Sequence, residues 1–102
     1  MPKRVDVNQA EIVEILRGMG CSVQHMHELG KGAPDILVGY RGDNYLFEIK
    51  DPGKPPSARK LTDDEQRWHE RWRGQVAVVT STYDVIEILK KNHGERPGWP
   101  AK

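Results

Sequence analysis

Two short segments with alternating apolar residues, 35–40 and 45–50, constrain the fold of this chain more than any other feature. Each has the period of two that is typical of a β-strand, and each is shorter than an ordinary helix. The residues between them, 41–44, read Arg-Gly-Asp-Asn, a composition typical of a hairpin turn. The sequence therefore predicts an antiparallel hairpin over residues 35–50.

A helix is expected before this hairpin. Asn8 with Glu11 three residues later resembles a capping box, and Gly20 is well placed to end the helix. Between them the apolar residues fall at i, i+3, i+4 and i+7, which indicates one buried stripe: Ile12, Ile15, Leu16 and Met19.

The rest of the chain alternates strands and helices. Residues 21–29 and 75–80 read as strands, Thr62 begins a helix with a capping box that runs to about Trp72, and Ser81 can cap a last helix. The expected order is α-β-β-β-α-β-α. This order favours an α/β fold with a four-stranded mixed sheet flanked by helices.

The length of 102 residues allows one domain, which we expect over residues 1–93, with a Gly/Pro-rich tail over 94–102. Residues 51–60 are rich in Pro and Gly and read as an exposed, mobile loop. Sixteen basic against fifteen acidic residues give a net charge of +1, so charge alone indicates no nucleic-acid partner. No apolar run reaches the ~18 residues of a membrane span. The single Cys21 excludes an intrachain disulfide framework, and we expect a reduced, cytoplasmic protein.

Three charged residues at the open end of the hairpin carry the strongest chemical signal. With a hairpin loop of two or four residues in register, Asp35 would lie opposite Lys50, and Leu37 opposite Glu48. Asp35, Glu48 and Lys50 would then share one face. Two carboxylates and an amine are costly to bury there unless they pair with one another or bind a metal.

This arrangement suits phosphodiester hydrolysis with Mg²⁺ or Mn²⁺. Carboxylate oxygens are the ligands that these hard cations prefer, and a lysine can orient the attacking water and stabilise developing charge. The simpler alternative is a salt-bridged hairpin on a solvated surface, because each short motif alone is weak.

The same residues carry a family resemblance. Pro34-Asp35 followed by Glu48-Ile49-Lys50, within this order of elements, resembles the PD-(D/E)XK nuclease superfamily. That superfamily has a restriction-endonuclease-like core and implies metal-dependent hydrolysis of DNA.

A narrower resemblance covers roughly residues 6–90. Segments 30–36 and 46–50, with Leu61-Thr62 followed by Gln66 and Trp68, resemble the virus-type replication-repair nuclease (VRR-NUC) family. The match is to its short stand-alone form, found in phages and bacteria. A phage-encoded protein of this kind would act in the cytoplasm of its host.

The resemblance implies roles residue by residue. Asp35, Glu48 and the backbone carbonyl of Ile49 would be metal ligands, Lys50 the catalytic lysine, and Gln66 a residue of the next helix near the site.

The superfamily also tends to place a glutamate on the first helix, and here two positions compete. Glu11 and Gln9 flank the apolar stripe on its two sides. Glu11 keeps a carboxylate and is preferred, although it can also be only the capping partner of Asn8. Aligning Gly20 with the glycine that ends this helix in junction resolvases favours Gln9 instead.

Basic residues next to this site are candidate DNA contacts. Lys54, Arg59 and Lys60 form a local run of positive charge just after the second strand of the hairpin, and Lys31 precedes Asp35 by four residues. Such charges can also belong to a solvated loop.

Aromatic residues and histidines have simpler interpretations. Trp68 and Trp72 lie at i and i+4 of a helix, which is more typical of a core or a subunit interface than of a base-stacking platform. His25 and His27 share a strand face, but their spacing shows no third zinc ligand.

The predicted function is metal-dependent endonucleolytic cleavage of DNA. Branched or Holliday-junction DNA is the expected substrate by family analogy only, and a homodimer would match the two-fold symmetry of a junction. The alternatives are a DNA-binding or assembly module that keeps the nuclease fold without activity, and a structural protein with no nucleic-acid partner.

Overall fold

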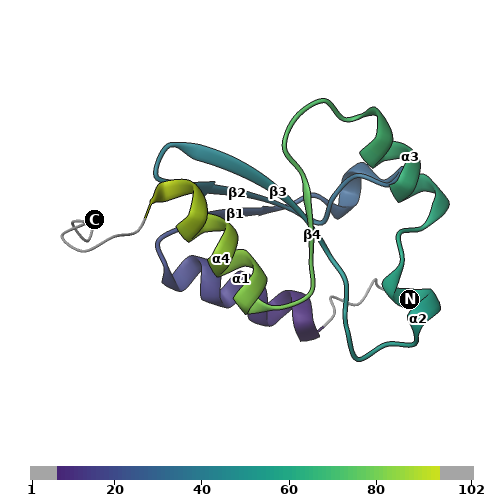
Figure 1. Cartoon of the computed structure of the whole chain (residues 1–102), viewed down its shortest axis with the longest axis horizontal. Coiled ribbons are helices and arrows are strands. Elements are labelled where there is room, and N and C mark those ends of the chain that lie inside the picture. Colours follow the sequence, from purple (N-terminus) through teal and green to yellow (C-terminus); the bar gives the residue numbers. More distant parts are fainter. Residues whose placement is uncertain (1–6, 95–102) are drawn as a thin grey trace.

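The structure is a computed structural model that describes residues 7–94. A four-stranded sheet is flanked by helices, as the sequence predicts (Figure 1). The elements in chain order are α1 (Val7–Gly18), β1 (Ser22–His25), a 3₁₀ turn η1 (His27–Leu29), β2 (Ile36–Tyr40), β3 (Asp43–Ile49), α2 (Pro56–Arg59), α3 (Asp63–Arg71), β4 (Ala77–Val79) and α4 (Thr82–His93). Among these described residues, no helix is long and apolar enough to cross a membrane.

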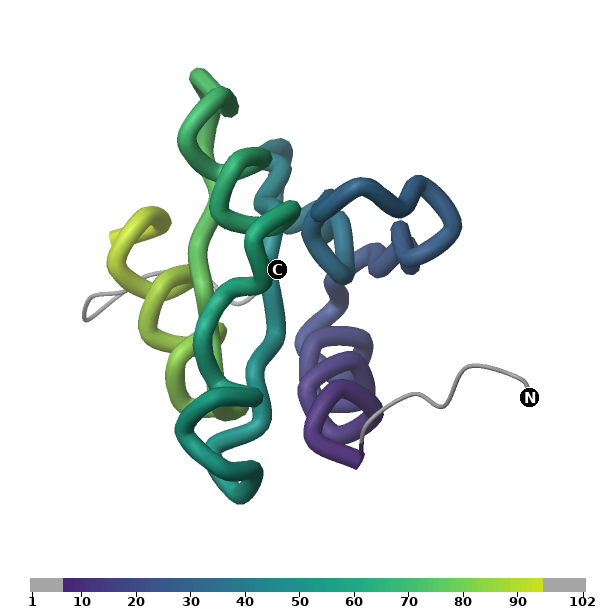
Figure 2. Tube along the Cα trace, turned by 90° about the vertical axis from the view of Figure 1, so that its right-hand side faces the viewer, coloured from purple at the N-terminus to yellow at the C-terminus, as the bar shows by residue number. Residues whose placement is uncertain are grey.

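The sheet is mixed, with the strand order β1-β2-β3-β4. The first three strands are antiparallel, and β4 pairs with β3 in parallel after the crossover through α2 and α3. The α/β prediction is therefore confirmed. In the side view of Figure 2, α3 and the segment around η1 face each other across the molecule.

The hairpin turn has two residues and lies one residue earlier than the predicted register requires. Tyr40 pairs with Asp43, so only Arg41 and Gly42 form the turn, and their φ angles of 49° and 88° are those of a type I′ turn. This turn twists in the same sense as the strands, which lets β3 begin two residues earlier than the turn composition suggested.

The predicted register of the hairpin is therefore wrong by two residues. Leu37 pairs with Leu46, not with Glu48, and Asp35 does not lie opposite Lys50. Because the side-chain period of a strand is two, a shift of two residues leaves every side chain on its predicted face.

The two faces of the sheet have different surroundings. Helices α1 and α4 contact each other and cover the face that contains the core, in which Ile12, Ile36, Val38, Phe47 and Leu89 are fully buried. The opposite face carries Leu37, Leu46 and Glu48, as their alternation with the core residues requires. No residue of α3 is buried, so this second face is only partly covered.

The helix boundaries confirm two caps and correct one. Thr62 and Glu65 form the predicted capping box of α3, and Ser81 accepts a hydrogen bond from the Asp84 N–H at the start of α4. Asn8, in contrast, lies inside the first turn of α1, so it is not the cap of that helix. Its amide has a tertiary role, described below, that sequence spacing cannot reveal.

Three further predictions change at their edges. Residues 51–60 contain the short helix α2, the strand expected over 21–29 ends at His25, and Gly94 ends α4 in a left-handed conformation. The rest of the predicted tail, 95–102, lies outside the described residues. Cys21 is buried as expected, and burial raises the pKa of its thiol.

Candidate active site

Asp35 is held at the start of β2 by its main chain. Its N–H donates to the Phe47 carbonyl at 3.0 Å, and its carbonyl accepts from the Met26 N–H at 2.9 Å. Its carboxylate Oδ2 accepts from the Ile49 N–H at 2.6 Å. The carboxylate therefore takes the place of a main-chain acceptor at the end of the hairpin, next to Glu48.

Glu48 is the only charged residue among the buried ones of the described chain, with 2% of its surface exposed. Its Oε1 has no hydrogen-bond partner. Burial first, and then the nearby carboxylate of Asp35, raise the pKa of Glu48 from 4.5 to about 9. The carboxyl group of Glu48 therefore stays protonated near neutral pH unless a positive charge binds beside it.

Lys50 supplies only part of that charge. Its Nζ lies 3.6 Å from Glu48 Oε2 but 2.7 Å from Glu65 Oε1. Burial by itself would lower the pKa of Lys50, but the hydrogen bond and the charge of Glu65 raise it. Lys50 is therefore a protonated ammonium shared between two glutamates.

Glu65 is a residue of the site that the sequence interpretation missed. Its Oε1 accepts both from the Thr62 N–H at 2.8 Å, in the capping box of α3, and from Lys50 Nζ. Burial opposes ionisation of Glu65, but these hydrogen bonds lower its pKa overall. The capping box alone explains a glutamate at position 65, so the sequence did not indicate that Glu65 also binds Lys50.

A glycine brings α3 close enough for this contact. Gly32 has a φ of 83°, and a Cβ at this position would collide with the main-chain carbonyl of Asp64. Only glycine allows the turn before Asp35 to approach the first turn of α3 so closely. Gly32 thus allows the first turn of α3, which carries Glu65, to lie against the turn before Asp35.

Asn8 fixes the other side of Lys50. Its Nδ2 donates to the Lys50 carbonyl at 2.9 Å and to the Thr80 carbonyl at 3.1 Å. It thereby joins α1 to the ends of the parallel strands β3 and β4. The residue predicted as a helix cap is instead a structural support of the site.

The other predicted site residues lie apart from this cluster. Gln66 is exposed and donates to Glu70 Oε2 at 3.1 Å. Glu11 is also exposed, and no hydrogen bond or ion pair found among the described residues joins it to Asp35 or Glu48. Gln9 contacts His25 Nδ1 at 3.3 Å. The structure therefore brings together Asp35, Glu48 and Lys50, but not these three.

The predicted DNA contacts are all at the surface. Lys31, Lys54, Arg59 and Lys60 are exposed, and Lys31 adopts a positive φ of 53° in the turn before Asp35. His27 lies in η1 and not in β1, although its ring still lies 6.1 Å from the ring of His25.

The cluster fits a hard divalent cation in composition. Within residues 7–94, no three His, Cys, Asp or Glu side chains form a ready-made metal site. Two adjacent carboxylates are nevertheless present, and the buried Glu48 Oε1 lacks a partner. The main-chain N–H of Ile49 points to Asp35, and since both main-chain groups of a strand residue point to the same side, its carbonyl does too. These three oxygen donors suit Mg²⁺ or Mn²⁺.

Comparison with known proteins gives the family. No family model matches the sequence, and no curated protein matches it. A solved structure described as a VRR_NUC domain is 31% identical in sequence and superposes with a TM-score of 0.59. The match covers 80% of this chain and 89% of that structure. With this identity and coverage, and with Asp35, Glu48 and Lys50 on one sheet face, the chain belongs to the VRR-NUC family.

Proposed function

We propose that this protein is a Mg²⁺- or Mn²⁺-dependent endonuclease that hydrolyses phosphodiester bonds in DNA. One observation carries the proposal: Glu48 is buried beside Asp35 with an unpartnered Oε1 and a pKa raised to about 9. A protein gains no stability from such a group, so its retention is best explained by a ligand. Asp35, Glu48 and the Ile49 carbonyl would hold the cation.

A bound divalent cation supplies a Lewis acid for the phosphate and lowers the pKa of an attacking water. The protein contributes the rest. Lys50 orients the water and stabilises negative charge on the phosphate, and Glu65 and Asn8 position Lys50 through its Nζ and its carbonyl. Gln66 and Glu11 lie outside the cluster and are weaker candidates for a role in catalysis.

DNA approaches over the segment that follows Lys50. Four exposed basic residues contact its phosphates: Lys31, Lys54, Arg59 and Lys60. We extend the proposal to branched or junction DNA, to a homodimer that supplies two sites in the symmetry of a junction, and to action in the cytoplasm.

The deciding experiment incubates the protein with Mg²⁺ or Mn²⁺ and single-stranded, duplex, flap and four-way-junction DNAs. Cleavage is expected with the wild type and not with Asp35→Ala, Glu48→Ala or Lys50→Ala. Glu14→Ala, an exposed glutamate of α1, is the matched control and should cleave normally.

Cleavage by purified Asp35→Ala at the wild-type rate would show that the site assignment is wrong. Calorimetry provides a second readout, because the metal should bind the wild type without DNA. If neither Mg²⁺ nor Mn²⁺ binds, with or without DNA, the protein is instead a module that keeps the nuclease fold without its activity.

A further inference from the structure

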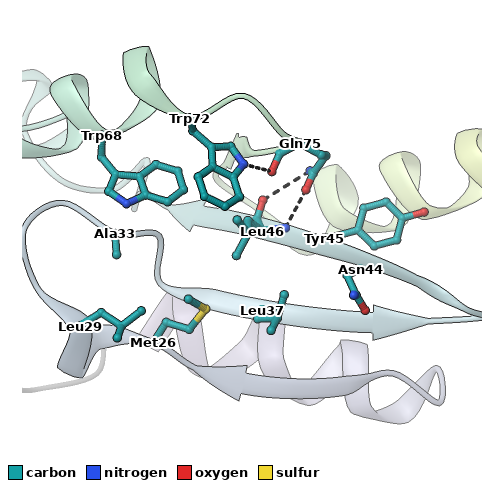
Figure 3. Close-up of a pocket in the computed structure, with 10 residues that line it drawn as sticks. All are labelled: Met26, Leu29, Ala33, Leu37, Asn44, Tyr45, Leu46, Trp68, Trp72 and Gln75. Atoms are coloured by element: carbon teal, nitrogen blue, oxygen red, sulfur yellow. Dashed lines mark hydrogen bonds between the residues drawn. The ribbon is translucent and has the colours of Figure 1, made fainter.

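An apolar groove of about 550 Å³ lies over Leu37 and Leu46 (Figure 3). The alternation of side chains along β3 puts Glu48 on the same sheet face as Leu46. Leu37 and Leu46 form its floor. Trp68 of α3 and Trp72, the residue that caps its C-terminus, form one wall, with their rings stacked at 4.6 Å and 20°. Met26 and Leu29 form the other wall. The tryptophans are therefore not part of the core. Trp72 is 43% exposed and Leu29 63%, so the groove is open to solvent.

The groove begins beside the candidate active site. Leu46 precedes Glu48 by two residues on β3, and Leu37 follows Asp35 by two residues on β2. At ~3.4 Å per strand residue, each floor residue is about 7 Å from its carboxylate-bearing neighbour. A nucleotide next to a phosphate held at Asp35 and Glu48 would therefore have its base within reach of the groove.

The polar atoms at the Trp72 end of the groove are already satisfied. Trp72 Nε1 donates to the Gln75 carbonyl at 3.0 Å, and the Gln75 amide bonds to both main-chain groups of Leu46. The walls therefore offer flat apolar and aromatic surface and few hydrogen bonds that would distinguish one base from another.

The charge around the tryptophans favours a nucleic acid over an acidic or neutral partner. Residues 67–73 contain three arginines and one glutamate, and because Asp64 neutralises Arg67, the balance beside the rings is +1 with His69 neutral. Arg67 is paired with Asp64 at 2.7 Å. Arg71 is the last residue of α3 and Arg73 follows the helix, and both are exposed. Cations beside stacked aromatic rings are the usual features of sites for single-stranded nucleic acid.

We infer that this groove binds an unpaired nucleobase of the nucleotide next to the cleaved phosphate, by stacking and without base preference. The inference rests on the proposed nuclease function and refines its substrate class. A base inside a duplex is already stacked on its neighbours, so the groove selects DNA with a single-stranded segment or an extruded base beside the scissile bond. A second copy of this chain is the competing occupant.

The test compares three labelled DNAs of equal length by fluorescence anisotropy, with EDTA present so that nothing is cleaved. They are a thymidine strand, the same strand with abasic sites, and a blunt duplex. The thymidine strand should bind more tightly than the abasic strand by about 5- to 150-fold, the range for stacking of one base. Phosphate contacts are equal in both, so the ratio isolates the base.

Two variants of one residue separate stacking from apolar packing. Trp68→Leu should reduce the affinity ratio to near one, while Trp68→Phe should keep most of it. Tyr83→Leu, which removes an exposed aromatic ring from α4, is the matched control. Leu29→Ser changes the opposite, exposed wall and should lower the ratio even if Trp68→Leu fails to fold.

Three results would overturn the inference. One is an unchanged ratio in folded Trp68→Leu and in Leu29→Ser. Another is a variant whose affinity ratio is unchanged but whose molar mass in solution falls below that of the wild type, which would show that a second copy of the chain occupies the groove. The third is a ratio of one in a wild type that binds and cleaves DNA, which leaves the nuclease proposal intact. Failure to bind or cleave any of the DNAs would instead refute the nuclease proposal itself.

Discussion

Replacing Glu48 by glutamine should remove a pH-dependent loss of stability. Because the folded protein raises the pKa of Glu48 from 4.5 to about 9, the folded state retains a proton that the unfolded state releases. The stabilising contribution of this proton is complete below pH 4.5 and is lost as the pH rises towards 9. A glutamine side chain carries no titrating proton, and its amide can donate to Asp35.

The magnitude follows from the width of this window. Each pH unit within it costs about 1.4 kcal/mol, so the wild type should lose about 3 kcal/mol between pH 5 and pH 7 relative to Glu48→Gln. Groups that do not interact with Glu48 titrate alike in both proteins and cancel in the difference, whereas Asp35, Lys50 and Glu65 interact with Glu48 and contribute to it. Urea denaturation in EDTA, at one-unit steps from pH 5 to pH 8, measures the free energy of unfolding of each protein.

Two comparisons make this result specific. Glu14→Gln, the same change at an exposed glutamate of α1, should leave the pH dependence unchanged. Mg²⁺ should restore stability to the wild type at pH 8 but not to Glu48→Gln, because the cation replaces the proton. A constant difference between wild type and Glu48→Gln from pH 5 to pH 8 would refute the assignment of a protonated, buried Glu48.

Three further changes test the supports of the site and its surface. Gly32→Ala should destabilise the protein by about 1–3 kcal/mol in urea denaturation, because its Cβ meets the carbonyl of Asp64, whereas Gly18→Ala, with open space around it, should not. Asn8→Ala should cost about 1–3 kcal/mol in the same assay, because two main-chain carbonyls lose their donor; equal stability would mean that water replaces the amide. Lys54, Arg59 and Lys60 changed together to Ala should flatten the slope of log K for DNA binding against log salt by ~0.9 for each lost phosphate contact. An unchanged slope would show that DNA binds elsewhere on the protein. Light scattering tests the homodimer, since a mass near 11.6 kDa in a protein that cleaves junctions would contradict it.

The sequence alone was sufficient for features that depend on local chemistry. The capping box at Thr62 was predictable because both partners lie within one helical turn. The shared face of Glu48 and Lys50 followed from strand parity, which survives a register error of two residues. The α/β order of elements and the VRR-NUC resemblance likewise depend on short segments of sequence, so both could be predicted from the sequence.

Only the tertiary structure decided which groups meet across the fold. The register depended on the two-residue turn at Arg41 and Gly42, and the site depended on Glu65 and Asn8, which come from helices distant in sequence. Glu65 has a real local role in the capping box of α3, and Asn8 was only predicted to have one, so local patterns concealed the tertiary role of both residues. Whether Trp68 packs in the core or lines a groove likewise depended on the distance between α3 and the sheet. Helical periodicity reports which side chains share a helix face, but the packing distance between elements determines whether that face closes into a core or leaves a groove.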